Sequence, residues 1–493
     1  MRPSSIEQSI LYPIANPGSI AFFGASNNIS AMGTTILRCI LSMGHKGSMK
    51  YQGEIYPVHP REETVQGIKA FQNVADLPVI PDLAFIVLPT TIVAETLDAC
   101  GQRGIRHAVI VSAGFNEVGG EGKDLQEELT AVAEKHGIRY LGPNCIGVIN
   151  TQMNLNATFL PYEADRGFIG MASQSGSFIT QISPHLSRQG MGFSTGFSIG
   201  NEASIDIVDC MEYLGACPRT RVIALYIESI RRGRAFIDAA RAIVPEKPIV
   251  AFYVGGSDEG RRAGFSHTGA LAGPDSLYDG VFRQSGVIRA TSIEELFDFC
   301  YCLGASPPVR GNRVIVQTHS GGPGAAAADA CGRSGLTLPN LSPATLESLK
   351  PYVPHTGSVA NPVDLTFTKN PLDFFQAIPQ ILMSDENADG LLVYFLATAR
   401  MIEVALKAMG VPDDETGKKA EEIIGLQADA IAALKEHSCK PIVGYSFLAR
   451  KESSLIRGLQ DRGVPVLPSP ERGARAMGAL VKYKNLKGKL TTE

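Results

Sequence analysis

The chain has 493 residues, of which 44% are hydrophobic and 19% charged, and its formal net charge is -4. This length is sufficient for about three ordinary domains, and a slightly acidic chain is not expected to bind nucleic acid through its overall charge. The sequence has no apolar run long enough for a membrane span and no signal-peptide pattern, and its nine scattered cysteines are typical of reduced thiols, so a cytoplasmic protein is expected.

The first 150 residues alternate short apolar runs with amphipathic segments. Strands are predicted at 19–24, 54–58, 83–89 and 107–113, and helices at 34–43, 91–103 and 122–136. The segment 140–150 is expected to close this unit. The alternation predicts a doubly wound α/β domain over residues 1–150, with ligands at the carboxyl ends of its strands.

Two further α/β units are predicted, over residues 151–305 and 311–493. The segment 171–190 aligns without a gap on 316–335, so that Ser175 and Gly176 fall on Ser320 and Gly321. A second matched pair of phrases, GNEASIDI and ANPVDLTF, follows downstream in the two units. Two copies of one α/β unit explain this repeat, with chance similarity between glycine-rich turns as the alternative.

The segment FFGASNN, residues 22–28, stands where a dinucleotide-binding fingerprint is expected. Only Gly24 matches the pattern GxGxxG. His59 and Arg61 follow the second strand, where NAD-binding proteins carry an acid for the ribose hydroxyls. A cation there favours a phosphorylated nucleotide over NAD, and an ordinary turn without a ligand is the alternative.

The segment SQSGS, residues 173–177, follows a predicted strand and opens a predicted helix. Free backbone N–H groups and the positive end of the helix dipole favour an anion there. Serine is also a common helix cap, so a purely structural turn is the alternative. The corresponding HSGGPG of the third unit has the same shape, but Pro323 removes one donor.

His267 lies in the glycine-rich segment GFSHTGALAG, residues 264–273, between Ser266 and Thr268. A lone histidine is more often structural than catalytic. Here the glycines leave the imidazole free to approach a ligand, and a neutral imidazole can attack phosphorus. Such a histidine needs a partner that holds its other ring nitrogen, and Glu228, at the end of the predicted strand 221–229, is the candidate.

Six motifs occur in one order along the chain: FFGAS, LGPNCIGV, SQSGS, GNEASID, YIES and SHTGALAG. In this order they resemble the NDP-forming acyl-CoA synthetases, most closely the α subunits of ADP-forming acetate–CoA ligases and more distantly those of succinyl-CoA synthetases. The resemblance covers nearly the whole chain. It implies a Rossmann-like CoA-binding domain followed by two flavodoxin-like doubly wound domains.

The resemblance also implies a role for individual residues. His267 would carry the phosphoryl group taken from an acyl phosphate, and Glu228 would orient it. Phosphate would be held by Ser175, Gly176 and Ser177. The residues implied to contact coenzyme A are Phe23, Gly24, Ala25, Ser26, Val58, Pro60, Arg61, Pro89, Ser112, Ala113, Gly114 and Asn144. No metal ligand is predicted in this chain.

The implied reaction is that of an acid–thiol ligase, which converts a small carboxylic acid, CoA and ATP to acyl-CoA, ADP and phosphate. No segment resembles a nucleotide-grasp domain, so a separate ATP-grasp β subunit is expected to bind ATP/ADP and Mg²⁺ in a hetero-oligomer, for which α2β2 is one arrangement. A non-catalytic CoA-binding regulatory protein is the main alternative. A CoA-dependent dehydrogenase using NAD is a second, disfavoured by the missing fingerprint.

Overall fold

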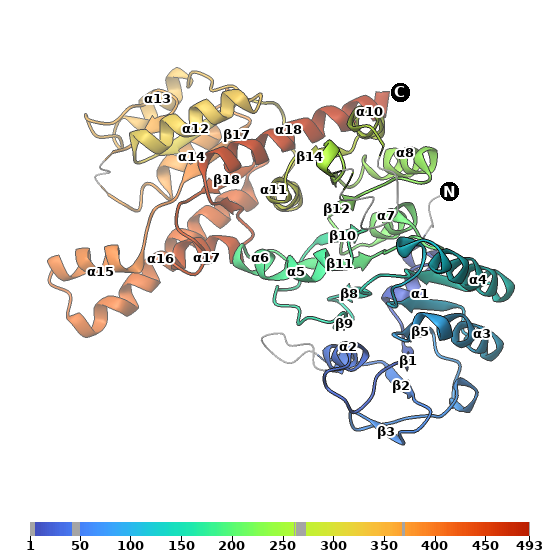
Figure 1. The fold of residues 1–493 in the computed structure, drawn as a ribbon. Helices are drawn as coiled ribbons and strands as arrows, with labels where there is room; N and C mark the ends of the chain where they lie inside the picture. Colours follow the sequence, from blue (N-terminus) through green and yellow to red (C-terminus); the bar gives the residue numbers. More distant parts are fainter. Residues whose placement is uncertain (1–4, 42–49, 261, 263–272, 367–369, 493) are drawn as a thin grey trace. The chain divides into compact units, whose positions relative to one another are not determined.

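The structure is a computed structural model that describes residues 5–41, 50–260, 262, 273–366 and 370–492 (Figure 1). The chain divides into two compact units. Unit 1 comprises residues 1–187 and 191–291, and unit 2 comprises residues 188–190 and 292–493. Within the described residues, no helix is both long enough and apolar enough to cross a membrane.

The first sheet of unit 1 has five parallel strands in the order β2-β1-β5-β6-β7. The strands are β1 (Ser19–Phe23), β2 (Glu54–Val58), β5 (Leu83–Ile86), β6 (His107–Ile110) and β7 (Arg139–Leu141), with a small hairpin of β3 (Thr64–Val65) and β4 (Ile68–Lys69). The helices are α1 (Tyr12–Ala15), α2 (Met32–Leu41), α3 (Val93–Arg103) and α4 (Glu121–His136), with short 3-10 turns η1 (Ile6–Gln8), η2 (Val74–Asp76), η3 (Thr90–Ile92) and η4 (Asn116–Val118). The doubly wound α/β architecture is as predicted.

Two of the predicted strands in this sheet end three residues early. β5 ends at Ile86 and β6 at Ile110, whereas the apolar runs continue to residues 89 and 113. The residues beyond each strand leave the sheet together, because the Ser112 hydroxyl donates to the Leu88 carbonyl oxygen at 2.6 Å and accepts the Leu88 N–H at 3.1 Å. These two segments form a wall at the carboxyl edge of the sheet.

The second sheet of unit 1 has seven strands in the order β14-β13-β12-β10-β11-β8-β9. The strands are β8 (Val148–Asn150), β9 (Leu155–Ala157), β10 (Ile169–Ser173), β11 (Phe193–Ser198), β12 (Val222–Ile227), β13 (Ile249–Tyr253) and β14 (Ile288–Ala290). The strands from β14 to β11 are parallel, and β8 pairs antiparallel with β11. The helices are α5 (Phe178–Gln181), α6 (Ser183–Arg188), α7 (Ile207–Ala216), α8 (Gly233–Ile243) and α10 (Asp275–Ser285).

Two segments of unit 1 differ in detail from the expectation. The stretch 140–150 does not stay in the first sheet: β7 completes that sheet, and β8 joins the second. Gly142 and Gly147, both at positive φ, lie where the chain passes from one sheet to the other. The single helix expected after SQSGS is divided into α5 and α6, since Pro184 has no N–H to continue the helical ladder.

Unit 2 is built on five parallel strands in the order β16-β15-β17-β18-β19. These are β15 (Val314–Thr318), β16 (Val363–Asp364), β17 (Gly390–Tyr394), β18 (Ile442–Tyr445) and β19 (Val466–Leu467). The helices are α11 (Ile293–Ala305), α12 (Gly321–Arg333), α13 (Pro343–Leu349), α14 (Ala377–Ser384), α15 (Ala399–Ala408), α16 (Asp413–His437), α17 (Ser454–Asp461) and α18 (Pro470–Thr492). Read from its first strand, this order matches the β11-β10-β12-β13-β14 part of the second sheet, as two copies of one α/β unit require.

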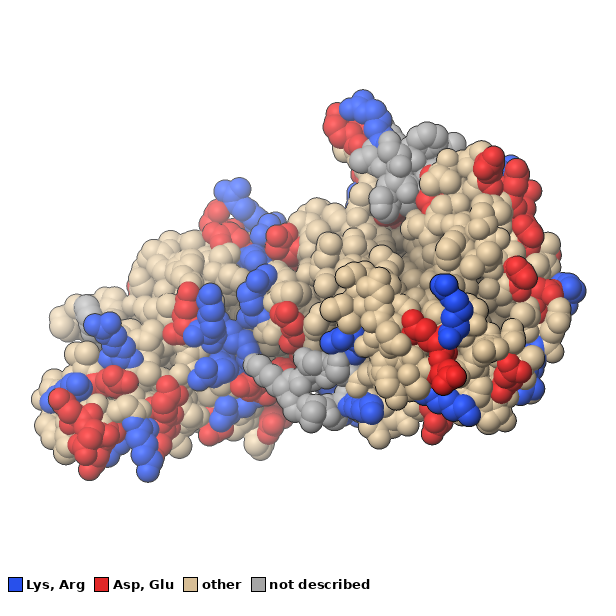
Figure 2. Space-filling view, turned by 60° about the horizontal axis from the view of Figure 1, so that its bottom comes forward, with Lys and Arg blue, Asp and Glu red and all other residues tan. Residues whose placement is uncertain are grey.

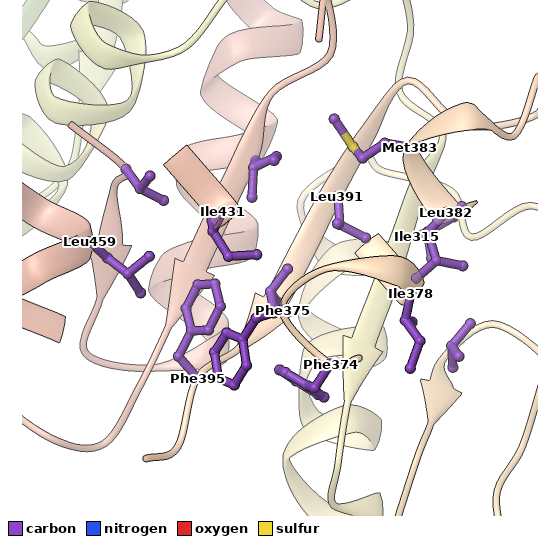
Figure 3. Close-up of a cluster of buried hydrophobic side chains, with 14 of the residues drawn as sticks. Ile315, Phe374, Phe375, Ile378, Leu382, Met383, Leu391, Phe395, Ile431 and Leu459 are labelled. Atoms are coloured by element: carbon purple, nitrogen blue, oxygen red, sulfur yellow. The ribbon is translucent and has the colours of Figure 1, made fainter. Parts of the chain in front are cut away.

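The helix α11 lies in the range expected for the second domain but clusters with unit 2. It packs against α18, where the Arg472 guanidinium makes two hydrogen bonds to the buried Asp298 carboxylate, at 2.6 and 2.7 Å. The core of unit 2 gathers aromatic and aliphatic side chains, among which Phe374 and Phe375 lie beside Phe395 (Figure 3). On the face shown in Figure 2, basic and acidic side chains are interspersed, so that acids offset the positive potential of neighbouring bases.

Candidate active site

A cavity of about 530 Å³ lies in unit 1 at the carboxyl ends of β5, β6 and β10. Six of the residues singled out in the sequence line it: Pro89, Ser112, Ala113, Asn144, Gly176 and Ser177. The first four were assigned to CoA and the last two to phosphate. The fold therefore brings residues from two predicted domains to one cavity.

Asn144 is held at the cavity wall by a hydrogen-bond chain. It adopts a positive φ of 59°, its N–H donates to the Ser112 carbonyl oxygen at 2.8 Å, and its amide donates to Asn201 at 3.3 Å. Asn201 in turn donates to the Glu117 carboxylate at 2.5 Å. Asn144 thus connects the GPNC turn to the GNEASID motif, and this pairing of distant segments positions its side chain.

The SQSGS turn forms the opposite part of the cavity. It follows β10, and the Ser173 hydroxyl donates to the Ser175 carbonyl oxygen at 2.9 Å, which closes the turn. Within the described part of the chain, no acceptor is bound by the backbone N–H groups of Ser175, Gly176 and Ser177. Three N–H donors at the carboxyl end of a strand suit the oxygens of a phosphate group.

Gln174, within the same motif, connects the SQSGS turn to Glu228. Its side-chain carbonyl accepts the N–H groups of Glu228 and Ser229 at 2.5 and 3.0 Å, and its amide donates to the Ser229 carbonyl oxygen at 2.8 Å. Glu228 follows β12, which pairs with β10, and only 9% of the residue is exposed. The sequence analysis assigned Gln174 no role, although it lies inside a motif that was recognised.

His267, Ser266 and Thr268 lie outside the described residues, so the predicted phosphohistidine has no structural account. The described chain stops at residue 262 and resumes at Gly273, whose carbonyl oxygen accepts the Tyr253 hydroxyl at 2.9 Å. Tyr253 ends β13, and β13 pairs with β12, which leads to Glu228. The described chain therefore resumes at the same edge of the sheet as Glu228.

The FFGAS turn does not line the cavity. Phe23 and Ala25 are buried, at 5% and 2% exposure, so each offers little surface to a ligand. Gly24 has a φ of 92°, and a Cβ there would overlap the Val87 carbonyl oxygen. The backbone N–H of Ser26 donates to the Thr34 hydroxyl at 3.0 Å, which fastens the turn to α2.

Val58 ends β2 and Pro60 and Arg61 follow it, and all three lie outside the cavity lining. His59 accepts the N–H groups of Arg61 and Glu62 at 3.3 and 2.9 Å, so it caps this turn. Glu62 accepts the N–H of Asn27 at 3.0 Å, which places a carboxylate against the turn after β1. Sequence reasoning missed this acid because it considered only the cations beside it.

The remaining predicted residue, Gly114, has a φ of 100° and donates its N–H to Glu117 at 2.6 Å. Other cavity-lining residues were not predicted, and they are Met32, Val87, Leu88, Val111, Cys145, Ile146, Phe159, Gln174 and Gly200. Most are apolar, and nothing in the local sequence distinguishes them from core residues. Four of them lie within quoted motifs, so motif membership was the available signal for Cys145, Ile146, Gln174 and Gly200.

Glu202, in the GNEASID motif, is a buried acid near this site. Its backbone has a positive φ of 53°, and its carboxylate accepts the Ile207 N–H at 2.8 Å and lies 3.9 Å from the Arg231 guanidinium. Burial raises its pKa to about 7, against the opposing effect of Arg231. Glu202 is therefore a group whose charge changes near neutral pH.

The substitution Glu202→Gln is expected to raise the free energy of unfolding of unit 1 at pH 8 by about 1–3 kcal/mol. The folded-state pKa lies above the unfolded value, so the stabilisation by the protonated acid is present at low pH and is lost as pH rises toward about 7. Urea unfolding at pH 5 and pH 8 measures this, with little change expected at pH 5. The exposed Glu128→Gln is the control, and equal pH dependence in wild type and Glu202→Gln would contradict the assignment.

Three family models match the chain. They are described as a CoA binding domain over residues 18–151, a succinyl-CoA ligase like flavodoxin domain over 166–303, and a Ligase-CoA domain over 314–419. Together they follow the order of the three sheets along the chain.

The chain is also similar to whole proteins. It is 38% identical to the α subunit of acetate–CoA ligase [ADP-forming] II of Pyrococcus furiosus, over 96% of this chain and 98% of that protein. It is 34% identical to the α subunit of acetate–CoA ligase [ADP-forming] I of the same organism, over 97% and 99%. A solved structure of Ca. Korarchaeum cryptofilum dinucleotide forming acetyl-coenzyme A synthetase 1, in complex with phosphate and ADP, matches with a TM-score of 0.85 and 32% identity over 98% of both chains. Likeness at this level over nearly the full length shows that the chain belongs to the ADP-forming acyl-CoA synthetases, as an α subunit.

Proposed function

We propose that this chain binds CoA and carries the phosphoryl group in the reversible reaction of a carboxylate, CoA and ATP to give acyl-CoA, ADP and phosphate. The observation that carries the proposal is the unit 1 cavity. It is lined both by residues assigned to CoA, such as Ser112 and Asn144, and by the Gly176 and Ser177 of the phosphate turn.

In the direction of ATP formation, phosphate held by the turn 175–177 attacks the thioester carbonyl carbon. The new C–O bond gives an acyl phosphate, the C–S bond breaks, and CoA leaves as the thiol with the proton that the attacking hydrogen phosphate loses. The N–H groups of Ser175, Gly176 and Ser177 face the negative charge that the phosphoryl oxygens carry, so they stabilise it without reorganising. Because Asn144 lines the same cavity, its amide is the candidate to bind near the thioester.

The second step transfers the phosphoryl group to His267. A P–N bond to the neutral imidazole forms, the P–O bond to the acyl group breaks, and the carboxylate leaves. Glu228 holds the other ring nitrogen and favours the charged product. Gln174 would make this possible indirectly, since its three hydrogen bonds hold the Glu228–Ser229 backbone. The phosphoryl group then passes to ADP.

We assign the binding of ATP/ADP and Mg²⁺ to a separate β subunit of the ATP-grasp type. The matched Pyrococcus proteins are named α subunits, which supports a second subunit in this system. We propose a cytoplasmic hetero-oligomer, with α2β2 as one arrangement, that acts on a small carboxylic acid. The regulatory alternative has little support, because the matched relatives are named as ligases and this chain retains His267, Glu228 and the phosphate turn.

The purified chain alone is expected to form no ATP from acyl-CoA, ADP and phosphate, because its proposed role ends at phosphorylated His267. Addition of the β subunit should restore turnover, and a panel of acyl-CoA esters assayed with both subunits would identify the acid. Luciferase detection of ATP measures the reaction. ATP formation by the chain free of other polypeptides would refute the division of roles.

The substitution Arg61→Glu is expected to weaken binding of CoA at least tenfold while changing binding of dephospho-CoA less. The reason is loss of a guanidinium–phosphate contact and gain of a repulsion at the 3′-phosphate. Calorimetric titration of the two ligands measures the difference. Arg219→Glu, an exposed charge reversal in the second domain, is the control. Equal weakening of both ligands by Arg61→Glu would show that Arg61 does not contact that phosphate.

A further inference from the structure

Unit 2 contains a cavity of its own, of about 440 Å³, at the carboxyl edge of its sheet. His319 follows β15 and Ala397 follows β17, and α15 and α16 supply the other side. The lining is almost entirely carbon, with Phe374 and Phe375 among its rings. Cavities of this size are typical of small-molecule sites.

The position of this cavity corresponds to that of the first one. β15 is bordered by β16 on one side and β17 on the other, so the chain reverses direction across the sheet at this point. Ligands of doubly wound folds bind at such a reversal. In the ungapped repeat His319 falls on Gln174, and both residues line the cavity of their own unit.

Gln427 makes the cavity unlike an ordinary gap in the core. It lies on the buried face of α16, between Ile424 and Ile431, where an aliphatic residue is expected. Only 4% of it is exposed, and within the described residues its side-chain carbonyl oxygen has no hydrogen-bond partner. A buried amide of this kind is unfavourable unless a bound group completes its hydrogen bonds.

The opposite wall is rigidly built. The His319 ring lies 5.0 Å from that of Phe374 and 4.9 Å from that of Tyr394, measured between centroids. Gln317 of β15 donates to the Phe374 carbonyl oxygen at 2.8 Å, and the Ser453 hydroxyl donates to the Ala397 carbonyl oxygen at 2.8 Å. Both segments of the wall are therefore fixed by buried side chains.

The charges at this site favour a neutral ligand. Burial lowers the pKa of His319, with Asp364 opposing, which favours the uncharged imidazole. No lysine or arginine is among the described residues that line the cavity. Asp364 is close enough to influence His319 electrostatically, and its negative charge also disfavours binding of an anion. An apolar body with one uncharged hydrogen-bonding group matches this lining.

We infer that the unit 2 cavity binds a small uncharged aromatic alcohol, whose ring lies among Phe374, Phe375 and Met401 and whose hydroxyl bonds to Gln427. A hydroxyl both donates and accepts, so it matches either orientation of the amide. The site shares no lining residue with the unit 1 cavity, and the inference does not depend on the proposed reaction.

The test uses the full chain and three probes that share the naphthalene ring system, namely 2-naphthol, 2-methylnaphthalene and 2-naphthoate. 2-Naphthol is expected to bind at least tenfold more tightly than the other two, by equilibrium dialysis. Its binding should shift the NMR methyl signals of Met401 and Met409, which line the cavity. Equal affinity for 2-naphthol and 2-methylnaphthalene would overturn the proposal without any variant.

Two variants locate the site. Gln427→Met keeps the shape of the side chain. It is expected to reduce the affinity for 2-naphthol at least tenfold and to change the affinity for 2-methylnaphthalene by less than twofold. Ala405→Trp should fill the cavity and abolish binding of both. Gln72→Met, at an exposed glutamine of unit 1, is the control. Unchanged 2-naphthol binding in Gln427→Met, or displacement of the probe by the β subunit, would show that the cavity is not such a site.

Discussion

Exchange of His267 for asparagine is expected to abolish labelling of this chain by radioactive phosphate in the presence of acyl-CoA. Asparagine has no nucleophilic nitrogen, so no phosphorus–nitrogen bond can form. Turnover with the β subunit should fall by several orders of magnitude, as loss of a covalent catalyst usually causes. The wild-type label should be stable in base and labile in acid, as phosphohistidine is.

Three comparisons make this experiment specific. His136→Asn removes a histidine that contacts Asp98 at 2.8 Å near the end of α4, and it should label normally. Glu228→Gln should label slowly, because the nucleophile remains but its orienting partner is weaker. CoA binding should be unchanged in His267→Asn. Persistent labelling of that variant would show that the phosphoryl carrier is another residue.

Substitution of Gly24 by valine is expected to destabilise the first domain by more than about 3 kcal/mol and to abolish CoA binding. The residue has a φ of 92°. Its new Cβ would lie 1.9 Å from the Val87 carbonyl oxygen, closer than the 3.0 Å at which Cβ atoms contact other heavy atoms in proteins. Val87 begins the segment that lines the cavity, so any relief of the overlap must move that wall. Thermal unfolding and CoA titration measure the two effects.

Gly67→Val separates backbone strain from overlap. Gly67 has a similar φ of 80°, but nothing lies within 4 Å of a Cβ built there. The free energy of unfolding of this control should fall only by the cost of a left-handed residue, about 1–2 kcal/mol. The variant should still bind CoA. Similar losses in both variants would mean that the close approach of Gly24 to Val87 has no special effect.

Local pattern was sufficient for the architecture. The predicted strand 54–58 is β2 residue for residue, although this edge strand is mostly half-buried. The helix expected at 122–136 is α4, which begins one residue earlier. The repeat of 171–190 in 316–335 predicted two related units, and the two sheets share their strand order. Element ends were less certain, since β5 and β6 stop where tertiary hydrogen bonds draw their ends from the sheet.

The site was predicted only as far as motifs allowed. SQSGS indicated an anion turn, but its link to Glu228 through Gln174 depends on β10 and β12 being neighbours, which no local pattern states. Arg61 and His267 remain predictions.

The sequence by itself determined the α/β class, the repeat and the family motifs, because these depend on residue types at short spacing. Only the tertiary structure decided that Asn144 and Gly176, 32 positions apart in the sequence, line one cavity, and that Glu62 reaches the turn after β1. It also decided that Gln427 is buried among apolar side chains. The physical reason is that cavities, buried amides and raised pKa values come from packing between segments, and that packing exists only once the sheets have assembled.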